Sequence, residues 1–170
     1  MLPQLTFILG GAASGKSAYA ESLFETTGSD RVYLATAQAY DAEMAEKIRL
    51  HVARRGRGWQ TVEASLDAAG ALRALTGSQR CLFDCATLWL SNHLLADHDL
   101  GSEQEALLAA IADCPAPLVI VSNEVGRGVV PDNALARRFR QAQGQLNIAL
   151  AARADRVVQV IAGLPQVLKG

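Results

Sequence analysis

Cysteine, excess charge and aromatic residues are all scarce in this chain of 170 residues. The three cysteines, Cys81, Cys85 and Cys114, are an odd number without paired metal-binding spacing, which argues against a disulfide framework and a zinc site. We therefore expect buried thiols in a reducing compartment. The formal net charge of −1 lacks the basic surplus of most duplex-binding proteins, so we expect no nucleic-acid partner.

Long apolar runs are also missing. No run approaches the roughly 18 residues needed to span a bilayer, and residues 1–11 lack a basic leader and a cleavage pattern. We expect no membrane span and a cytoplasmic location. Because 50% of the residues are hydrophobic and 19% are charged, the composition is globular, and we expect residues 1–170 to form one domain.

Apolar segments of strand length alternate with segments of helical spacing. Near-continuous apolar runs suit strands that are covered on both faces, so the alternation predicts an α/β fold with a mainly parallel sheet and helices on both faces. The expected strands are 5–9, 32–36, 81–84, 118–122 and 156–163. The expected helices are 17–24, 41–55, 66–75, 87–95, 102–112 and 133–154. Ser102 and Glu105 match a capping box, which predicts that their helix begins at Ser102.

A phosphate-binding loop is predicted where the first strand meets the first helix. Residues 8–21 read ILGGAASGKSAYAE and contain the spacing G-x-x-x-x-G-K-S. Glycines let backbone N–H groups converge on phosphate oxygens, and the helix N-terminus adds positive potential. The predicted nucleotide contacts are Gly10, Gly11, Ala12, Ala13, Ser14, Gly15, Lys16 and Ser17. We count Lys16 as catalytic because it would reach the outer phosphates, and the Ser17 hydroxyl would ligate Mg²⁺. The alternative is a glycine turn with a solvated lysine.

Asp84 ends the expected strand 81–84 and is the best-placed partner for a nucleotide-bound Mg²⁺. A carboxylate at this position could instead only cap the helix that follows.

His51 lies on the apolar stripe of the expected helix 41–55, immediately before a cluster of arginines. Neutral imidazole is a nitrogen nucleophile toward phosphorus, and neighbouring guanidinium groups would keep it neutral and bind phosphate oxygens. A partly buried core histidine is the alternative, and local composition alone leaves both readings open.

Blocks along nearly the whole chain resemble the bifunctional adenosylcobinamide kinase / adenosylcobinamide-phosphate guanylyltransferase family of cobalamin biosynthesis. The matching blocks are residues 10–21, 32–63, 82–95, 122–155 and 163–169. The loop alone is widespread, whereas the block around His51 and the stretch NEVGRGVVP (123–131) are more specific.

The resemblance implies two reactions and a site. Adenosylcobinamide is phosphorylated with ATP or GTP, and GMP is then transferred from GTP to adenosylcobinamide phosphate through a guanylylated histidine, which corresponds to His51, giving adenosylcobinamide-GDP. It further implies Mg²⁺, a RecA-like P-loop NTPase fold and a homo-oligomer, often a trimer. Its additional nucleotide contacts correspond to Ala35, Thr36, Ala37, Val52, Ala53, Arg54, Arg55, Glu63 and Asp84.

Two positions depart from the family pattern. Ala13 stands where the loop usually has arginine, and Ser65 stands near a usual proline. The missing arginine puts the strength of triphosphate binding in doubt. A P-loop kinase of another small metabolite without a covalent intermediate, or a nucleotide-binding switch module, are the competing functions.

Two further segments are less decisive. Asn123 and Glu124 could position substrate or metal, or their segment could be a glycine-rich turn. His93 and His98 lack metal-type spacing and companion carboxylates, so we expect no metal there.

Overall fold

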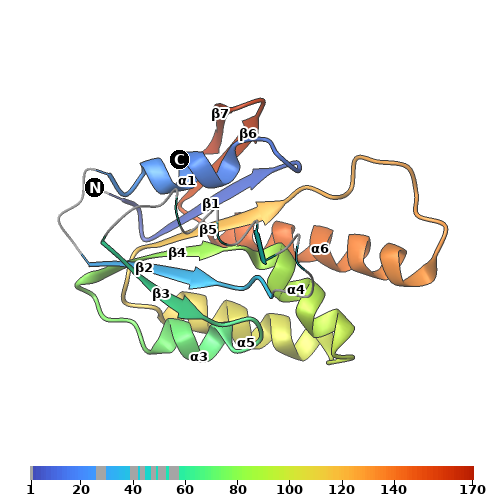
Figure 1. Ribbon diagram of the computed structural model, residues 1–170, viewed down its shortest axis with the longest axis horizontal. Coiled ribbons are helices and arrows are strands. Elements are labelled where there is room, and N and C mark those ends of the chain that lie inside the picture. The colour runs from blue at the N-terminus through green and yellow to red at the C-terminus, as the bar shows by residue number, and fades with distance from the viewer. Residues whose placement is uncertain are drawn as a thin grey trace.

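A seven-stranded sheet forms the centre of the computed structural model, which describes residues 2–25, 30–38, 42, 45–46, 49, 53 and 58–170 (Figure 1). The strand order is β3-β2-β4-β5-β1-β6-β7, and neighbours are parallel except β7, which is antiparallel to β6. The strands are β1 (Leu5–Gly10), β2 (Asp30–Ala35), β3 (Trp59–Glu63), β4 (Gln79–Asp84), β5 (Leu118–Asn123), β6 (Arg156–Ile161) and β7 (Leu164–Lys169).

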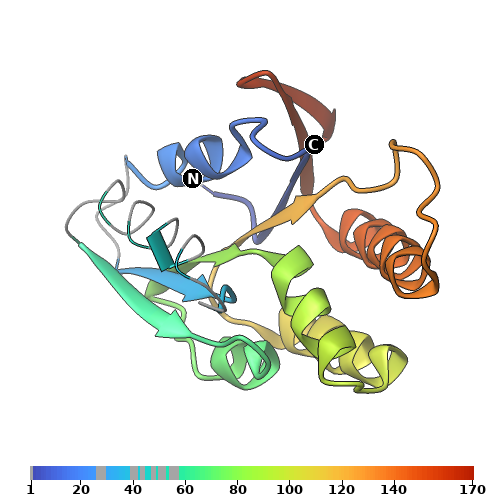
Figure 2. The same cartoon turned by 45° about the vertical axis from the view of Figure 1, so that its right-hand side comes forward.

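Helices cover both faces of the sheet, as Figure 2 shows. They are α1 (Lys16–Ser22), α3 (Ala68–Arg73), α4 (Ala86–Leu95), α5 (Leu100–Asp113) and α6 (Ala134–Arg153). Helix α1 lies on one face, and α3 to α6 lie on the other. The predicted α/β architecture is therefore confirmed. None of the described helices is both long and apolar enough to cross a membrane.

Two layers of core explain why the strands are apolar at nearly every position. Phe7 packs on the side of α3 to α6, while the next residue, Ile8, packs on the side of α1 with Ala20 and Phe24. Successive strand residues point to opposite faces, so a sheet covered twice needs apolar side chains in both registers.

Two strands and one helix start differ from the sequence prediction. Strands β3 and β7 were not predicted. The expected strand 156–163 consists of β6 and the turn that joins it to β7 in a hairpin. Ala162 (φ 51°) and Gly163 (φ 79°) both have positive φ, which is the backbone of a two-residue type I′ turn. Helix α5 begins at Leu100 because Asp99, which accepts a 2.7 Å hydrogen bond from Ser102 N, is its cap; the Ser102 capping box was wrong.

The expected helix 41–55 falls largely outside the described residues. Those described within it, residues 42, 45, 46, 49 and 53, are helical. All three cysteines are free and buried, as expected. Burial raises the pKa of Cys81 to about 12, so this thiol is protonated at neutral pH.

Candidate phosphate-binding site

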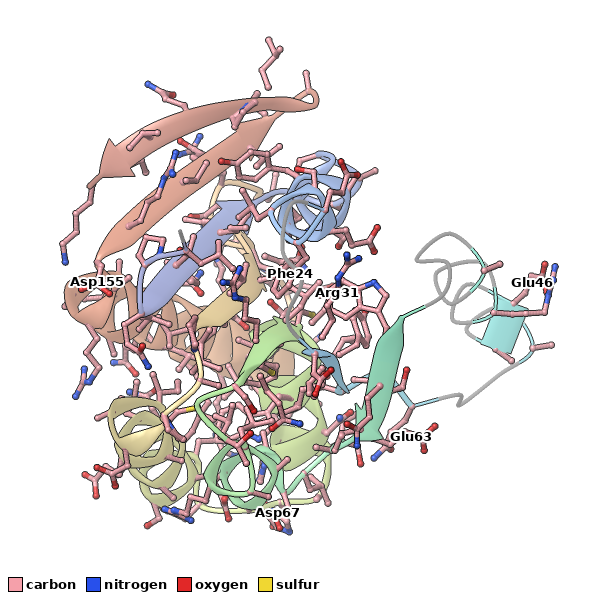
Figure 3. All side chains as sticks on the ribbon, turned by 90° about the vertical axis from the view of Figure 1, so that its left-hand side faces the viewer. Phe24, Arg31, Glu46, Glu63, Asp67 and Asp155 are labelled. Atoms are coloured by element: carbon pink, nitrogen blue, oxygen red, sulfur yellow. The ribbon has the colours of Figure 1, made fainter. Side chains whose placement is uncertain are left out.

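The carboxyl ends of the parallel strands bring several predicted site residues to one edge of the sheet. Asp84 on β4 is opposite Ala35 on β2, and Ala35 is in turn opposite Glu63 at the end of β3, which Figure 3 labels. On the other side of β4, Gly10 of β1 is opposite Asn123 of β5. Ligands of open α/β sheets bind at this edge, because the loops that follow the strands leave the sheet there.

The predicted phosphate loop connects β1 to α1, as its spacing requires. Gly15 caps α1 with φ 91°, and a Cβ at this position would lie 3.1 Å from the Cα of Gly163. The loop also accepts a 2.8 Å hydrogen bond from Gly163 N through the carbonyl of Ser14. The turn of the β6–β7 hairpin therefore contacts the loop and supports it. Only glycine at position 15 allows both the positive φ and the close approach of Gly163.

Lys16 lies inside this loop rather than in solvent. Its side chain is buried, and Nζ donates a 3.0 Å hydrogen bond to the carbonyl of Gly11. Burial lowers the pKa of Lys16, while the acidic groups of Cys85 and Asp84 oppose that shift where they are ionised. Because burial raises the pKa of Cys85 to about 12, its thiol is neutral at pH 7, and Asp84 is the anion that acts on Lys16.

Asp84 is held by Tyr33 of β2 and by Thr36, the residue that follows this strand. Tyr33 donates from its hydroxyl to Asp84 Oδ2 over 3.1 Å. Thr36 clamps the next residue, because its Oγ1 donates to Cys85 O and accepts from Cys85 N, each at 2.8 Å. The Asp84–Cys85 peptide bond is cis. Asp84 is therefore a held carboxylate at the strand end and not the cap of α4, a role that Cys85 takes with its sulfur.

The hydroxyl, N–H and carbonyl groups of Thr36 are all hydrogen-bonded to other parts of the protein. In addition to the Cys85 clamp, Thr36 N donates to Asp84 O at 3.3 Å and Thr36 O accepts from Asn92 Nδ2 at 2.8 Å. The side chain is fully buried. Thr36 thus positions the strand ends around Asp84.

Two buried polar atoms at this edge have no hydrogen-bond partner among the described residues. They are Ser14 Oγ in the loop and Asn123 Oδ1 at the end of β5. Buried polar groups are almost always paired, so each marks a position where a bound ligand or water would complete the hydrogen bonding. A hydroxyl can donate to a phosphate oxygen, whereas an amide oxygen needs a donor such as water.

A buried polar network supports Asn123. Thr87 Oγ1 accepts from Asn123 N at 2.8 Å, and Asn147 Nδ2 donates to Asn123 O at 3.1 Å. Gln143 Nε2 donates to Asn147 Oδ1 and to Ser122 Oγ, both at 2.9 Å. The network joins α4, β5 and α6. Sequence reasoning missed it, and its only signal was polar residues at positions 143 and 147, one helical turn apart on α6.

The loop after β5 is held by a bond within the loop and by bonds to β1 and α6. Glu124 N donates to Gly10 O at 3.0 Å, and Glu124 Oε1 accepts from Gly126 N at 2.6 Å. Arg140 of α6 donates to Gly126 O, and Arg137 donates to Asp132 O at 2.7 Å. Of the two readings left open for this segment, the turn describes Glu124, while Asn123 stays a candidate ligand contact.

The remaining predicted site residues differ in their exposure, and some of them lie outside the described residues. Ala13 is exposed with φ 54°, so a longer side chain here would project from the loop surface. Ser17 and Ala37 are half-buried, and Glu63 is exposed. The exposed Ala53 is the described member of segment 52–55; His51, Val52, Arg54 and Arg55 lie outside the described residues. Tyr33, the partner of Asp84, was missed because a buried strand tyrosine reads as core.

A mainly parallel sheet, with a buried lysine in a glycine-rich loop between the first strand and the helix that follows it, defines the P-loop NTPase class. The structure is similar to the ATPase of a type III secretion system from pathogenic bacteria, with a TM-score of 0.60 and 13% identity over 98% of this chain. This chain spans 57% of that ATPase chain. A protein of Pyrococcus horikoshii OT3 has a TM-score of 0.55 and 8% identity over 100% of this chain and 88% of its own. At such identities the likeness shows the fold alone.

The family model "Cobinamide kinase / cobinamide phosphate guanyltransferase" matches residues 6–168. The chain belongs to this family of transferases, which confirms the resemblance carried by its motifs. It is 48% identical over 166 residues to the bifunctional adenosylcobalamin biosynthesis protein CobP of Pseudomonas aeruginosa, covering 96% of each chain. It is 36% identical over 176 residues to the corresponding protein CobU of Escherichia coli, covering 94% of this chain and 97% of that one.

Replacing Gly15 tests the support of the loop by the hairpin. Gly15→Ala should lower the free energy of unfolding by about 1–2 kcal/mol from the left-handed backbone alone, with a further cost from contact with Gly163. Gly144→Ala is the matched control, because Gly144 is exposed within α6 and a Cβ there meets nothing within 4 Å. The control should be stabilised by about 0.5–1 kcal/mol. Urea unfolding measures both, and equal effects of the two changes would contradict the assignment.

Proposed function

We propose that this chain phosphorylates adenosylcobinamide with ATP or GTP and then transfers GMP from GTP to the product, giving adenosylcobinamide-GDP. The observation that carries the proposal is the match of the family over residues 6–168 in a chain whose phosphate loop holds a buried Lys16. Both reactions attack a phosphorus atom of a nucleoside triphosphate. One loop could therefore present the nucleotide for both, to a substrate hydroxyl at the γ-phosphate and to an imidazole at the α-phosphate.

In the kinase step, we assign positioning and charge stabilisation to the loop. Backbone N–H groups of residues 10–17 would bind phosphate oxygens, and Lys16, already directed along the inside of the loop by Gly11 O, would offset charge on the outer phosphates. Little other chemistry is required of the protein, because phosphoryl transfer depends chiefly on positioning and electrostatics.

In the second step, His51 would be the nucleophile. Its neutral nitrogen attacks the α-phosphorus of GTP, an N–P bond forms, and pyrophosphate leaves. A phosphate oxygen of adenosylcobinamide phosphate then attacks the same phosphorus, and the N–P bond breaks to release free imidazole. Arg54 and Arg55 would bind the phosphate oxygens during the transfer.

Mg²⁺ fits the oxygen donors at this sheet edge. Ser17 at the first turn of α1 and Asp84, held by Tyr33, would hold it together with the nucleotide. Bound there, the ion would neutralise charge on the phosphate oxygens. The other proposed nucleotide contacts are Ala35, Ala37, Val52, Ala53 and Glu63, with Thr36 acting through the backbone that it positions.

Self-association is also proposed. Large apolar side chains are exposed on the loop after β5 and on α6, with Val129 96% and Ile148 72% exposed, and on the β6–β7 hairpin, with Leu164 72% exposed. Patches of this kind mark interaction surfaces. Sedimentation equilibrium should give a mass that is a multiple of 18.1 kDa, most simply three chains as in the resemblance, and a monomer at all concentrations would refute the assembly.

Neutralising Lys16 and Asp84 separates nucleotide binding from folding. Lys16→Met should weaken GTP binding at least tenfold, about 1.4 kcal/mol, with or without Mg²⁺. The unfolding temperature of the free protein should change little, because the pKa of Lys16 is lowered in the folded chain: burial disfavours its charge by more than Asp84 favours it. Asp84→Asn should bind GTP normally in EDTA and lose the gain that Mg²⁺ brings. Calorimetric titration measures the affinities; wild-type binding by Lys16→Met would refute the role of Lys16.

The covalent step is tested with GTP that carries ³²P at either the α- or the γ-phosphate. Label from [α-³²P]GTP should stay on the protein through a bond stable to base and labile to acid, whereas label from [γ-³²P]GTP should not. His51→Ala should lose this label and still transfer γ-phosphate to adenosylcobinamide. Glu105→Gln, which changes an exposed side chain on α5 outside the proposed site, is the control and should label normally. Full labelling of His51→Ala would exclude His51, and γ-transfer to other small metabolites but not to adenosylcobinamide would favour a different kinase.

A further inference from the structure

Three side chains with metal-binding atoms meet where α4 turns into α5. His93 lies near the end of α4, His98 in the connecting turn and Glu103 in the first turns of α5. One ligand atom from each residue lies within 4.8 Å of the others, the only such group found among the described residues. The missing companion carboxylate of the sequence analysis is thus supplied by Glu103.

The backbone of the turn brings His98 over His93. Asp97 has φ 56°, which reverses the chain, and His98 N donates a 3.0 Å hydrogen bond to His93 O. Asp99 then caps α5, so Glu103 follows one turn later on the same side. The ligand positions therefore belong to a hydrogen-bonded turn.

The hydrogen bonding of His93 leaves a lone pair on its Nδ1. Its Nε2 lies 3.1 Å from the carbonyl of Leu66, which can only accept, so Nε2 carries the proton. In the neutral ring, Nδ1 then has a lone pair, which accepts the 2.9 Å hydrogen bond from His98 Nδ1; a metal ion would take the place of this shared proton, and the proton of His98 would move to its other nitrogen or be released. Metal-binding histidines commonly donate their other N–H to a carbonyl in this way, which fixes the tautomer and the ring orientation.

The separations are close to those of a tetrahedral ion. His93 Nδ1 lies 2.9 Å from His98 Nδ1, and Glu103 carboxylate oxygens lie 3.7 Å from His93 Nδ1 and 3.9 Å from His98 Nδ1. Ligand atoms about 2.0–2.1 Å from a tetrahedral zinc ion are about 3.3 Å apart. Small movements of the two partly exposed side chains, each 40% or less exposed, would reach this geometry.

The surroundings combine one rigid ligand with solvent access. His93 is buried and its ring packs 4.6 Å from that of Trp89, whose Nε1 also donates to Leu66 O at 2.9 Å. A pocket of about 210 Å³ opens beside the cluster, and Asp67 in its lining adds a further carboxylate nearby. A fourth, water-filled coordination position is compatible with this opening.

We propose that His93 Nδ1, His98 Nδ1 and Glu103 bind a divalent ion of the zinc type. Two imidazoles and one carboxylate suit Zn²⁺ and Co²⁺, whereas Mg²⁺ prefers all-oxygen ligands. The site is separate from the phosphate site. Helix α4 begins at Ala86, next to Asp84, and His93 lies seven residues further on, roughly 10 Å along the helix. It would join α4, α5 and the Leu66 segment.

Metal titration of the purified full chain, stripped with chelator and free of nucleotide and Mg²⁺, tests the site. Zn²⁺ should bind at one equivalent per chain with micromolar or tighter affinity and raise the unfolding temperature. Co²⁺ should give the intense visible absorption of four-coordinate nitrogen and oxygen ligation. His98→Ala and Glu103→Gln change partly exposed side chains and should each weaken Zn²⁺ at least tenfold and reduce the Co²⁺ spectrum.

Two controls locate the ion. Glu105→Gln changes an exposed carboxylate on α5 and should bind Zn²⁺ as the wild type does. His51→Ala removes the third of the three histidines and should also keep the site. Failure of the wild type to bind Zn²⁺, retention of full affinity by His98→Ala, or loss of binding in His51→Ala alone would each overturn the proposal.

Discussion

Parallel pairing of β1 between β5 and β6 is the constraint on which the phosphate site depends. It places Gly10 beside Asn123 at the carboxyl edge and beside the carbonyl of Val160, where a Cβ on Gly10 would lie only 2.7 Å from that oxygen. The turn that follows β6 then lies against Gly15. The loop is thus shaped by strands at both sides, and Gly10 and Gly15 are required by neighbouring backbone as much as by a ligand.

The charges at this edge are held by residues that do not bind a nucleotide themselves. Tyr33 and the Thr36 clamp hold the end of β4, so the electrostatic interaction of Asp84 with Lys16 comes from a carboxylate on a fixed backbone. Cys85 contributes no charge at neutral pH because burial keeps its thiol protonated. A cation and an anion prepared in this way need little reorganisation when phosphates bind, which is the condition for electrostatic catalysis.

Helix α4 connects the two candidate sites. It begins directly after Asp84 and Cys85, and its last turns carry His93. Between them, Asn92 Nδ2 donates to Thr36 O and to Ser65 O, both at 2.8 Å, so the helix is bonded to the ends of β2 and β3. An ion bound at His93 would therefore stiffen a helix whose other end supports the phosphate site, which gives the second site a structural path to the first.

Local patterns in the sequence were enough for the fold class, most element positions and the place of the phosphate loop between a strand and a helix, because apolar periodicity and glycine spacing are properties of neighbouring residues. The family followed from the resemblance of longer blocks, chiefly the one around His51 and residues 123–131. Strand β3 and the hairpin were missed because short exposed strands lack a continuous apolar signal. The Tyr33–Asp84 bond, the network at Asn123 and the grouping of His93, His98 and Glu103 depend on chain reversals and on pairing between strands distant in sequence. Only the tertiary structure decided those, because side chains converge through strand register and turn geometry, which no local spacing encodes.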